Sequence, residues 1–154
     1  MRRNEKAVTD PAELTEILRA GRVCRLAIAA EPAPYIVPLN YGYRDGVLYF
    51  HSAQQGRKIE LLRQNPLVGF EISLDLGIVT GEQACNWGAR YRSVIGCGRI
   101  EFIEGLEEKR RGLDAIMAQY APGDFSYPAA AVQGTCLYKL LISDISGKQA
   151  RVAD

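Results

Sequence analysis

An Asp-Gly pair at positions 45 and 46 constrains the fold of this chain more than any other feature of the sequence. Residues 35–41 before it and 47–50 after it are mostly β-branched, aromatic or otherwise strand-forming. Asp-Gly accepts the positive φ angles that a tight hairpin turn requires. The sequence therefore predicts two antiparallel strands joined at Arg44-Asp45-Gly46.

A polar corner follows the second predicted strand and leads into a helix. The corner holds His51, Ser52, Ala53, Gly56, Arg57 and Lys58. Helix N-termini present free backbone N–H groups and a partial positive charge, so a phosphate group could bind here. The alternative is that the two cations are only solvated and that Ser52 is only a cap, because basic residues in a first helical turn oppose the helix dipole.

The rest of the pattern predicts a mainly β chain with attached helices. Asp10 and Pro11 are typical of a helix start and Gly21 of a helix end. Helices are expected at 10–21, 54–65 and 107–120, and further strands at 23–29, 67–73, 91–104 and 136–142. Short sequential strands favour an antiparallel barrel over a doubly wound sheet. We expect one domain over residues 1–154, with a polar tail at 146–154 that frays.

Two features interrupt this pattern. Pro38 lies inside a predicted strand, and a proline cannot donate to a sheet, so we expect a sheet edge, a bulge or backbone that faces a ligand there. Residues 74–89 are expected to form an irregular loop. That loop holds Trp87, the single tryptophan, whose role is either to plug the packing or to line a binding site.

Composition and motifs exclude several classes of protein. The net charge is +1 and the basic residues are dispersed, so no nucleic-acid partner is expected. No apolar run reaches the ~20 residues of a membrane helix, and no leader peptide is recognisable. The four cysteines form no Cys-x-x-Cys pair, which argues against a metal site and fits a reducing cytoplasm, with Cys85 as a candidate redox thiol. The glycine motifs of dinucleotide and nucleoside triphosphate folds are missing.

Three stretches carry a resemblance to a known family. They are PYIVPLNYGY at 34–43, LYFHSAQQGRKIELLRQNP at 48–66 and ACNWGARYRSVIGCGRIEFIEGLEEKR at 84–110. In this order they resemble the FMN-binding split-barrel superfamily, the relatives of pyridoxamine 5′-phosphate oxidase. Within it they are most similar to the 5-nitroimidazole-resistance branch.

The resemblance implies a six-stranded antiparallel split barrel that forms a homodimer, with FMN in a groove at each side of the subunit interface. The isoalloxazine ring would lie beside the strand at 37–41, and the phosphate beside Arg57 and Lys58. Trp87 would close the pocket, from the partner subunit. The implied cofactor-binding residues are Val37, Pro38, Leu39, Asn40, Tyr41, His51, Ser52, Ala53, Arg57, Lys58, Trp87, Arg92, Ser93 and Val94.

The resemblance also implies oxidoreductase chemistry, in which NADH or NADPH reduces FMN and electrons pass to a small acceptor such as a nitroaromatic. The C-terminal segment lacks the arginine-rich pattern that binds substrate in pyridoxamine phosphate oxidases, so that activity is not expected. No catalytic residue is assigned. His51, the single histidine, is the first candidate proton donor, with Tyr41 and Tyr91 below it, although a neutral hydrogen-bonding role is favoured for His51. The alternative is a non-catalytic flavin- or haem-binding dimer, for which one histidine offers at most one axial haem ligand.

Overall fold

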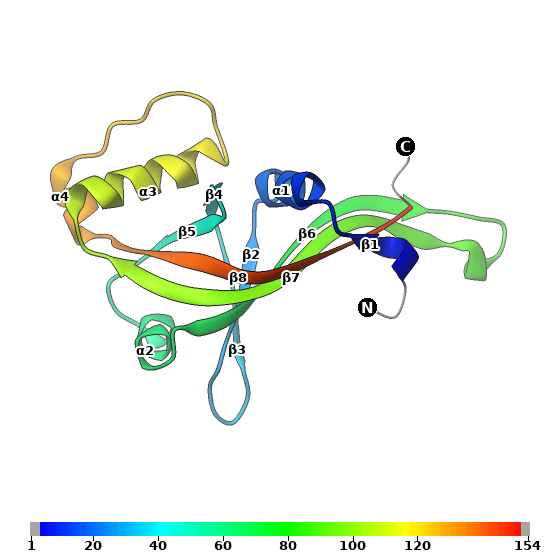
Figure 1. Cartoon of the computed structure of the whole chain (residues 1–154), viewed down its shortest axis with the longest axis horizontal. Helices are drawn as coiled ribbons and strands as arrows, with labels where there is room; N and C mark the ends of the chain where they lie inside the picture. The colour runs from blue at the N-terminus through cyan, green and yellow to red at the C-terminus, as the bar shows by residue number, and fades with distance from the viewer. Residues whose placement is uncertain (1–3, 152–154) are drawn as a thin grey trace.

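The computed structural model describes residues 4–151 and contains one antiparallel sheet with helices packed around it (Figure 1). The strands are β1 (Ala7–Val8), β2 (Cys24–Ile28), β3 (Tyr35–Leu39), β4 (Gly42–Arg44), β5 (Val47–Ser52), β6 (Leu67–Val79), β7 (Gly88–Ile103) and β8 (Cys136–Ala150). The helices are α1 (Pro11–Ala20), α2 (Arg57–Gln64), α3 (Leu106–Ala118) and α4 (Ala129–Gly134), with 3₁₀ turns η1 (Asn4–Lys6) and η2 (Ala84–Asn86). This is the mainly β, antiparallel fold that the sequence predicts.

The strand order is β3-β2-β6-β7-β8-β5-β4, with β1 beside β8. β3 and β4 are consecutive in the chain but lie at opposite ends of this order. The segment from Tyr35 to Arg44 therefore connects the two ends of the sheet, which curls into a split barrel. The sheet has eight strands rather than the predicted six, because that segment contributes two strands and the short β1 adds another.

The predicted turn is confirmed, but the predicted hairpin is only partly right. Asp45 and Gly46 have φ angles of 51° and 80° and connect β4 to β5. Residues 35–39 pair instead with β2, where Tyr35 faces Ile28 across the ladder. At Asn40 the chain stops pairing with β2, and it then pairs with β5. Which strand each part pairs with depends on distant segments, so the local sequence does not reveal it.

Alternating residues of the strands point into one core. Phe50 of β5 stacks on Tyr138 of β8, with ring centroids 5.6 Å apart. Helices α1 and α2 each bury two apolar residues in this core, since amphipathic helices stabilise a barrel by covering its open parts. These helical residues are Ile17, Leu18, Ile59 and Leu62. The start of α1 is as predicted, because the Asp10 carboxylate accepts a hydrogen bond from the Ala12 N–H at 3.0 Å.

Two predicted irregular segments belong to long strands. β6 continues to Val79 and β7 begins at Gly88, so much of 74–89 is a two-stranded arm with a register shift between Asp75 and Ile78. Figure 1 shows this arm projecting from the barrel. The predicted fraying tail is also wrong for residues 146–150, because β8 pairs with β7 as far as Ala150, opposite Tyr91. Residues 152–154 of that tail lie outside the described residues.

Two smaller differences concern helices. The helix expected from residue 54 begins at Arg57, after the positive-φ residue Gly56. The short α4 lies in a stretch for which the sequence predicts only a loop. Across residues 4–151, none of the helices combines the length and the apolar character needed to cross a bilayer.

Candidate functional site

The corner between β5 and α2 brings His51 and Lys58 together. The imidazole lies on the solvent side of β5, and its partial burial together with the Lys58 charge lowers the pKa of His51. Lys58 is half-buried, and desolvation lowers the pKa of its ammonium group. No carboxylate of residues 4–151 lies within ion-pair distance of Lys58. An anion is the missing partner that this corner would stabilise.

The first turn of α2 is open. Gly56 precedes it with φ 124° and ψ 164°, and no side chain hydrogen-bonds to the N–H groups of this turn. A Cβ built on Gly56 meets no atom within 4 Å, so the backbone is accessible from that side. Ser52 does not cap the helix, since its hydroxyl donates to the Ala53 carbonyl at 2.9 Å. The N–H groups of Arg57 and Lys58 are therefore available to a phosphate oxygen, whereas those of Ile59 and Glu60 donate to the Gly56 carbonyl at 2.9 and 3.1 Å.

Arg57 connects this corner to the strand β3. Its guanidinium carbon lies 5.0 Å from the centre of the Tyr35 ring, in cation–π geometry. In the strand order of the described chain, β3 is an end strand that pairs with β2 alone, and it contains Pro38. Of the three alternatives that Pro38 leaves open, the structure has the sheet edge. The contact between Arg57 and Tyr35 joins the start of the β3 edge to the α2 corner. We call this region the corner site and define it by β3, His51 to Ala53, Arg57 and Lys58.

The side chains at 37–41 differ in what they can offer a ligand. Val37 and Leu39 are half-buried against the core, while Pro38 and Asn40 are exposed. The Asn40 amide donates to the Tyr120 hydroxyl at 3.1 Å. Tyr41 has no exposed surface, and burial raises the pKa of its hydroxyl, which donates to the Leu18 carbonyl at 2.6 Å. Tyr41 is therefore a core residue here and is not positioned as a proton donor.

Three residues of β7 that the sequence predicts to contact the cofactor lie away from the corner site. The Arg92 guanidinium donates to the Glu16 carboxylate of α1 at 3.3 Å. Val94 is fully buried in the core, so its side chain offers a ligand no surface within one chain. The Ser93 hydroxyl donates to the Lys148 carbonyl at 3.4 Å, next to β8. One chain does not bring these residues to the corner site.

Trp87 also lies apart from the corner site. It stands at the tip of the β6–β7 arm, with 54% of its surface exposed, and its indole N–H donates to the Gly81 carbonyl at 2.8 Å. Figure 1 shows the arm and α2 well separated in the molecule. A ligand bound at the corner site could therefore contact Trp87 only if this tryptophan belonged to a second copy of the chain.

The outer face of β3, β2, β6 and β7 carries exposed apolar side chains. Ile36, Leu67 and Ile95 are 63%, 57% and 58% exposed. Between them lies the Arg25–Glu71 ion pair, with N and O 2.9 Å apart. Large apolar side chains gathered on a sheet face are typical of a surface that contacts another protein. We call this the outer face.

Sequence reasoning missed Tyr35 as a site residue, because its contact with Arg57 joins positions that no local pattern links. It likewise missed the near-complete burial of Lys109 on α3 and its hydrogen bond to the Thr135 carbonyl at 2.8 Å. A lysine within an otherwise charged helical run gives no sign that it points inward. Among residues 4–151 there is no cluster of three metal-ligating side chains.

Comparisons with known proteins agree with this architecture. A candidate 5-nitroimidazole antibiotic resistance protein from Bacteroides thetaiotaomicron VPI-5482 shares 36% identity, with a TM-score of 0.82 over 92% of this chain and 85% of that one. An FAD-binding protein from Mesorhizobium loti shares 31% identity, with a TM-score of 0.66 over 92% of this chain and 96% of that one. An uncharacterised protein, RA0666, of Rhizobium meliloti (strain 1021) is 34% identical over 95 residues, which are 62% of this chain and 56% of that protein.

The family itself follows from the extent of the match. The family model described as pyridoxamine 5′-phosphate oxidase matches residues 10–149, which include every strand of the barrel except β1 and the last residue of β8. The split barrel and the similarity to a solved structure at 36% identity are consistent with that match. The chain therefore belongs to the pyridoxamine 5′-phosphate oxidase family.

Proposed function

We propose that this chain binds FMN at the corner site and works as a dimeric flavin-dependent oxidoreductase. The observation that carries the proposal is the half-buried Lys58 ammonium, which lacks a carboxylate partner in the described chain and adjoins the open first turn of α2. A phosphate monoester would satisfy both groups together, since it accepts hydrogen bonds from an ammonium and from helix N–H groups.

The flavin ring would extend from this phosphate along β3. Exposed edge strands present unpaired backbone N–H and C=O groups, and these are the groups that read the polar edge of a flat heterocycle. Arg57 lies over Tyr35 at the start of β3, which keeps the guanidinium on the same surface as the strand. His51 is neutral near pH 7 because its pKa lies below the ordinary value, so it could donate or accept one hydrogen bond to the ligand without adding charge.

The dimer is part of the same proposal. The outer face would be covered by a second copy, and that copy would bring Trp87 and the region of Ser93 to the corner site from which they are separated within one chain. Apolar side chains at Ile36 and Ile95 would lose water on association, which favours the dimer. The partner would also shield the flavin ring from solvent.

FMN, when bound, would supply the two-electron chemistry, accepting electrons from NADH or NADPH and passing them to a small acceptor such as a nitroaromatic. The chain contributes position, charge and exclusion of water. The nitroaromatic acceptor is suggested by the similarity to the Bacteroides protein. Pyridoxamine phosphate oxidation is not part of the proposal, because the end of β8 lacks an arginine-rich segment. The free thiols in the described chain fit a cytoplasmic location.

The alternative is a flavin or haem carrier without turnover. Haem is disfavoured because His51 is the single histidine, and the adjacent Lys58 charge would oppose binding of its imidazole to a cationic iron. A carrier and an oxidoreductase differ in one measurable property. The flavin of an oxidoreductase is reduced by a nicotinamide and reoxidised by an acceptor over many cycles.

The first experiment is an FMN titration of the purified chain, followed by quenching of flavin fluorescence and by light scattering for the mass. We expect a dimer that binds FMN saturably, with one FMN for each chain. About one equivalent of NADH or NADPH per bound FMN should then bleach the flavin absorbance. The variant Ile95→Arg should lower the fraction of dimer and weaken FMN binding with it. Riboflavin binding as tightly as FMN would refute the phosphate assignment, and an FMN-loaded monomer would refute the shared site.

A further inference from the structure

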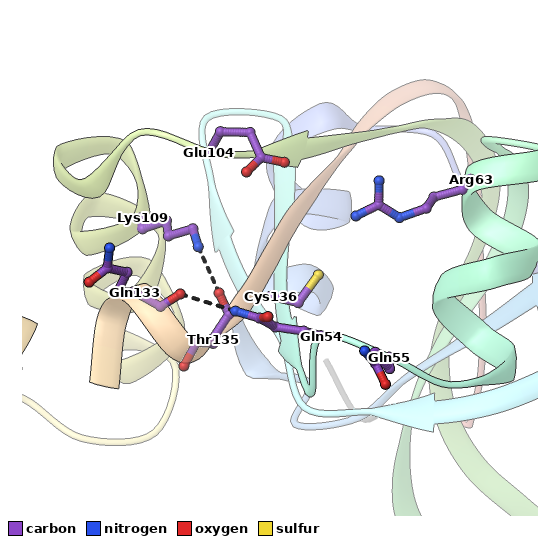
Figure 2. Close-up of a pocket in the computed structure, with 8 residues that line it drawn as sticks. All are labelled: Gln54, Gln55, Arg63, Glu104, Lys109, Gln133, Thr135 and Cys136. Atoms are coloured by element: carbon purple, nitrogen blue, oxygen red, sulfur yellow. Dashed lines mark hydrogen bonds between the residues drawn. The ribbon is translucent and has the colours of Figure 1, made fainter. Parts of the chain in front are cut away.

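A charged hollow lies beside the corner site and is not used by the proposed function. Its volume is about 410 Å³, within the range of small-molecule sites. Figure 2 shows Lys109 and Gln133 on one side, from α3 and α4, and Arg63 of α2 on the other. Glu104, just after β7, and Cys136, the first residue of β8, also line the cavity. Three helices and two strands thus meet around one polar cavity.

Lys109 is the only charged residue of the described chain that is buried, with 8% of its surface exposed. Its ammonium donates to the Thr135 carbonyl at 2.8 Å, and no carboxylate of residues 4–151 lies within ion-pair distance. An ammonium has three N–H donors, and a single neutral carbonyl does not compensate a buried charge. The cavity side of Lys109 therefore favours an anion.

Arg63 supplies a second cation without a carboxylate partner in the described ranges. Its guanidinium carbon lies 4.7 Å from the centre of the Phe102 ring, a cation–π contact that helps to hold the group at the cavity wall. A guanidinium carries five donors and binds a carboxylate or phosphate oxygen pair in its plane. A cation–π contact does not use the N–H donors, so they stay available to a ligand.

The remaining wall limits what the ligand can be. Glu104 lines the cavity but forms no ion pair with Arg63 or Lys109 in the structure, so it would repel a molecule of high negative charge. The Gln54 amide donates to the Gln133 carbonyl at 3.2 Å and connects the two sides of the cavity. The cavity thus combines two cations with one anion and neutral amides, which suits a small ligand with one net negative charge.

We propose that this cavity is a separate binding site for a small organic anion that carries one carboxylate or phosphate group. The oxyanion contacts Arg63 and Lys109, and hydroxyl or amine groups on the same molecule contact Glu104 and the glutamine amides. The proposal does not depend on FMN. Because Gln54 belongs to the loop between His51 and α2, and Cys136 pairs with Ser52 across the ladder, occupancy of the cavity would stiffen the wall of the corner site.

The test uses the full chain labelled with ¹⁵N, titrated separately with sodium acetate and sodium phosphate at constant ionic strength. Saturable shifts are expected at the backbone amides of 133–136 and 109, and the tighter of the two anions identifies the group that the site prefers. Arg63→Gln should raise the dissociation constant at least tenfold. The matched control is Arg111→Gln. Arg111 is exposed, lies on α3 with Lys109 and does not line the cavity, so this variant should leave the dissociation constant within twofold of the original value. Lys109→Met, if it folds, should repeat the effect of Arg63→Gln.

Three results would overturn the proposal. The first is anion shifts that do not saturate or that spread over the whole surface. The second is an Arg63→Gln variant that binds both anions as the unmodified chain does. The third is displacement of the bound anion by saturating FMN, which would make the cavity part of the flavin phosphate site. Failure of FMN to bind at all would refute the proposed function alone, since the anion titration is read without it.

Discussion

Replacing Lys58 with alanine tests the corner site most directly. The ammonium is half-buried, its pKa is lowered mainly by desolvation, and it has no carboxylate partner among residues 4–151. A phosphate would give it a charge-assisted hydrogen bond, worth about 1.5–3 kcal/mol. At about 1.4 kcal/mol for each factor of ten, Lys58→Ala should raise the dissociation constant for FMN about 10- to 150-fold.

The same variant should not destabilise the free protein. A desolvated ammonium without a counter-charge opposes folding, so its removal should leave the melting temperature of the FMN-free chain unchanged or higher. The assay is a fluorescence titration with FMN at low salt, with thermal unfolding measured beside it, and Lys6→Ala in η1 as the control lysine. An unchanged dissociation constant for FMN would refute the assignment of the phosphate to Lys58. A large fall in melting temperature would mean that Lys58 has a structural role instead.

The remaining predictions concern His51 and two buried positions. His51 gives the single imidazole signal of an untagged chain, so its pKa can be followed by NMR; it should titrate below the ordinary value of about 6.5 in the free protein and move upward when FMN brings a negative charge beside it. A pKa that does not change on FMN binding would place the phosphate elsewhere. Gly42→Ala would put a Cβ 2.2 Å from the Ala115 carbonyl oxygen of α3, so the free energy of unfolding in urea should fall by about 2 kcal/mol or more; a neutral variant would contradict the packing of β4 on α3. Tyr41→Phe removes a buried hydroxyl that donates to the Leu18 carbonyl, so it should cost about 1 kcal/mol in the same assay, and an increase in stability would show that the hydroxyl is not paired in solution.

The β4–β5 turn, the start of α1 and the α2 corner could be predicted from the sequence because their signals are local. The positive φ angles at Asp45 and Gly46 and the cap at Asp10 follow from the conformational freedom or hydrogen bonding of those residues, and the structure has them where the pattern predicts. The proximity of His51, Gly56 and Lys58, between a strand and a helix, could be predicted for the same reason. These residues are near one another in the chain, so their proximity needs no tertiary fold.

The pairing of the strands could not be predicted from the sequence in this way. Residues 35–41 look like one strand that leads into the turn because most of them favour extended backbone, yet residues 35–39 pair with β2 and residues 42–44 pair with β5. Likewise, residues 146–150 read as a polar tail, but their backbone groups complete the β7 and β1 ladders. Backbone hydrogen bonds carry no side-chain signature, so polar residues can form a strand wherever a neighbouring strand offers partners.

The sequence by itself therefore determined the class of fold, the position of the turn and the polar corner before α2, because these depend on neighbours in the chain. Only the tertiary structure decided that Arg57 lies over Tyr35, that Arg92 faces α1, and that Lys109 and Arg63 share a cavity. Each of those contacts joins segments that are remote in sequence. Their meeting depends on how the sheet curls and which faces the helices cover, and that is settled by packing of the whole core.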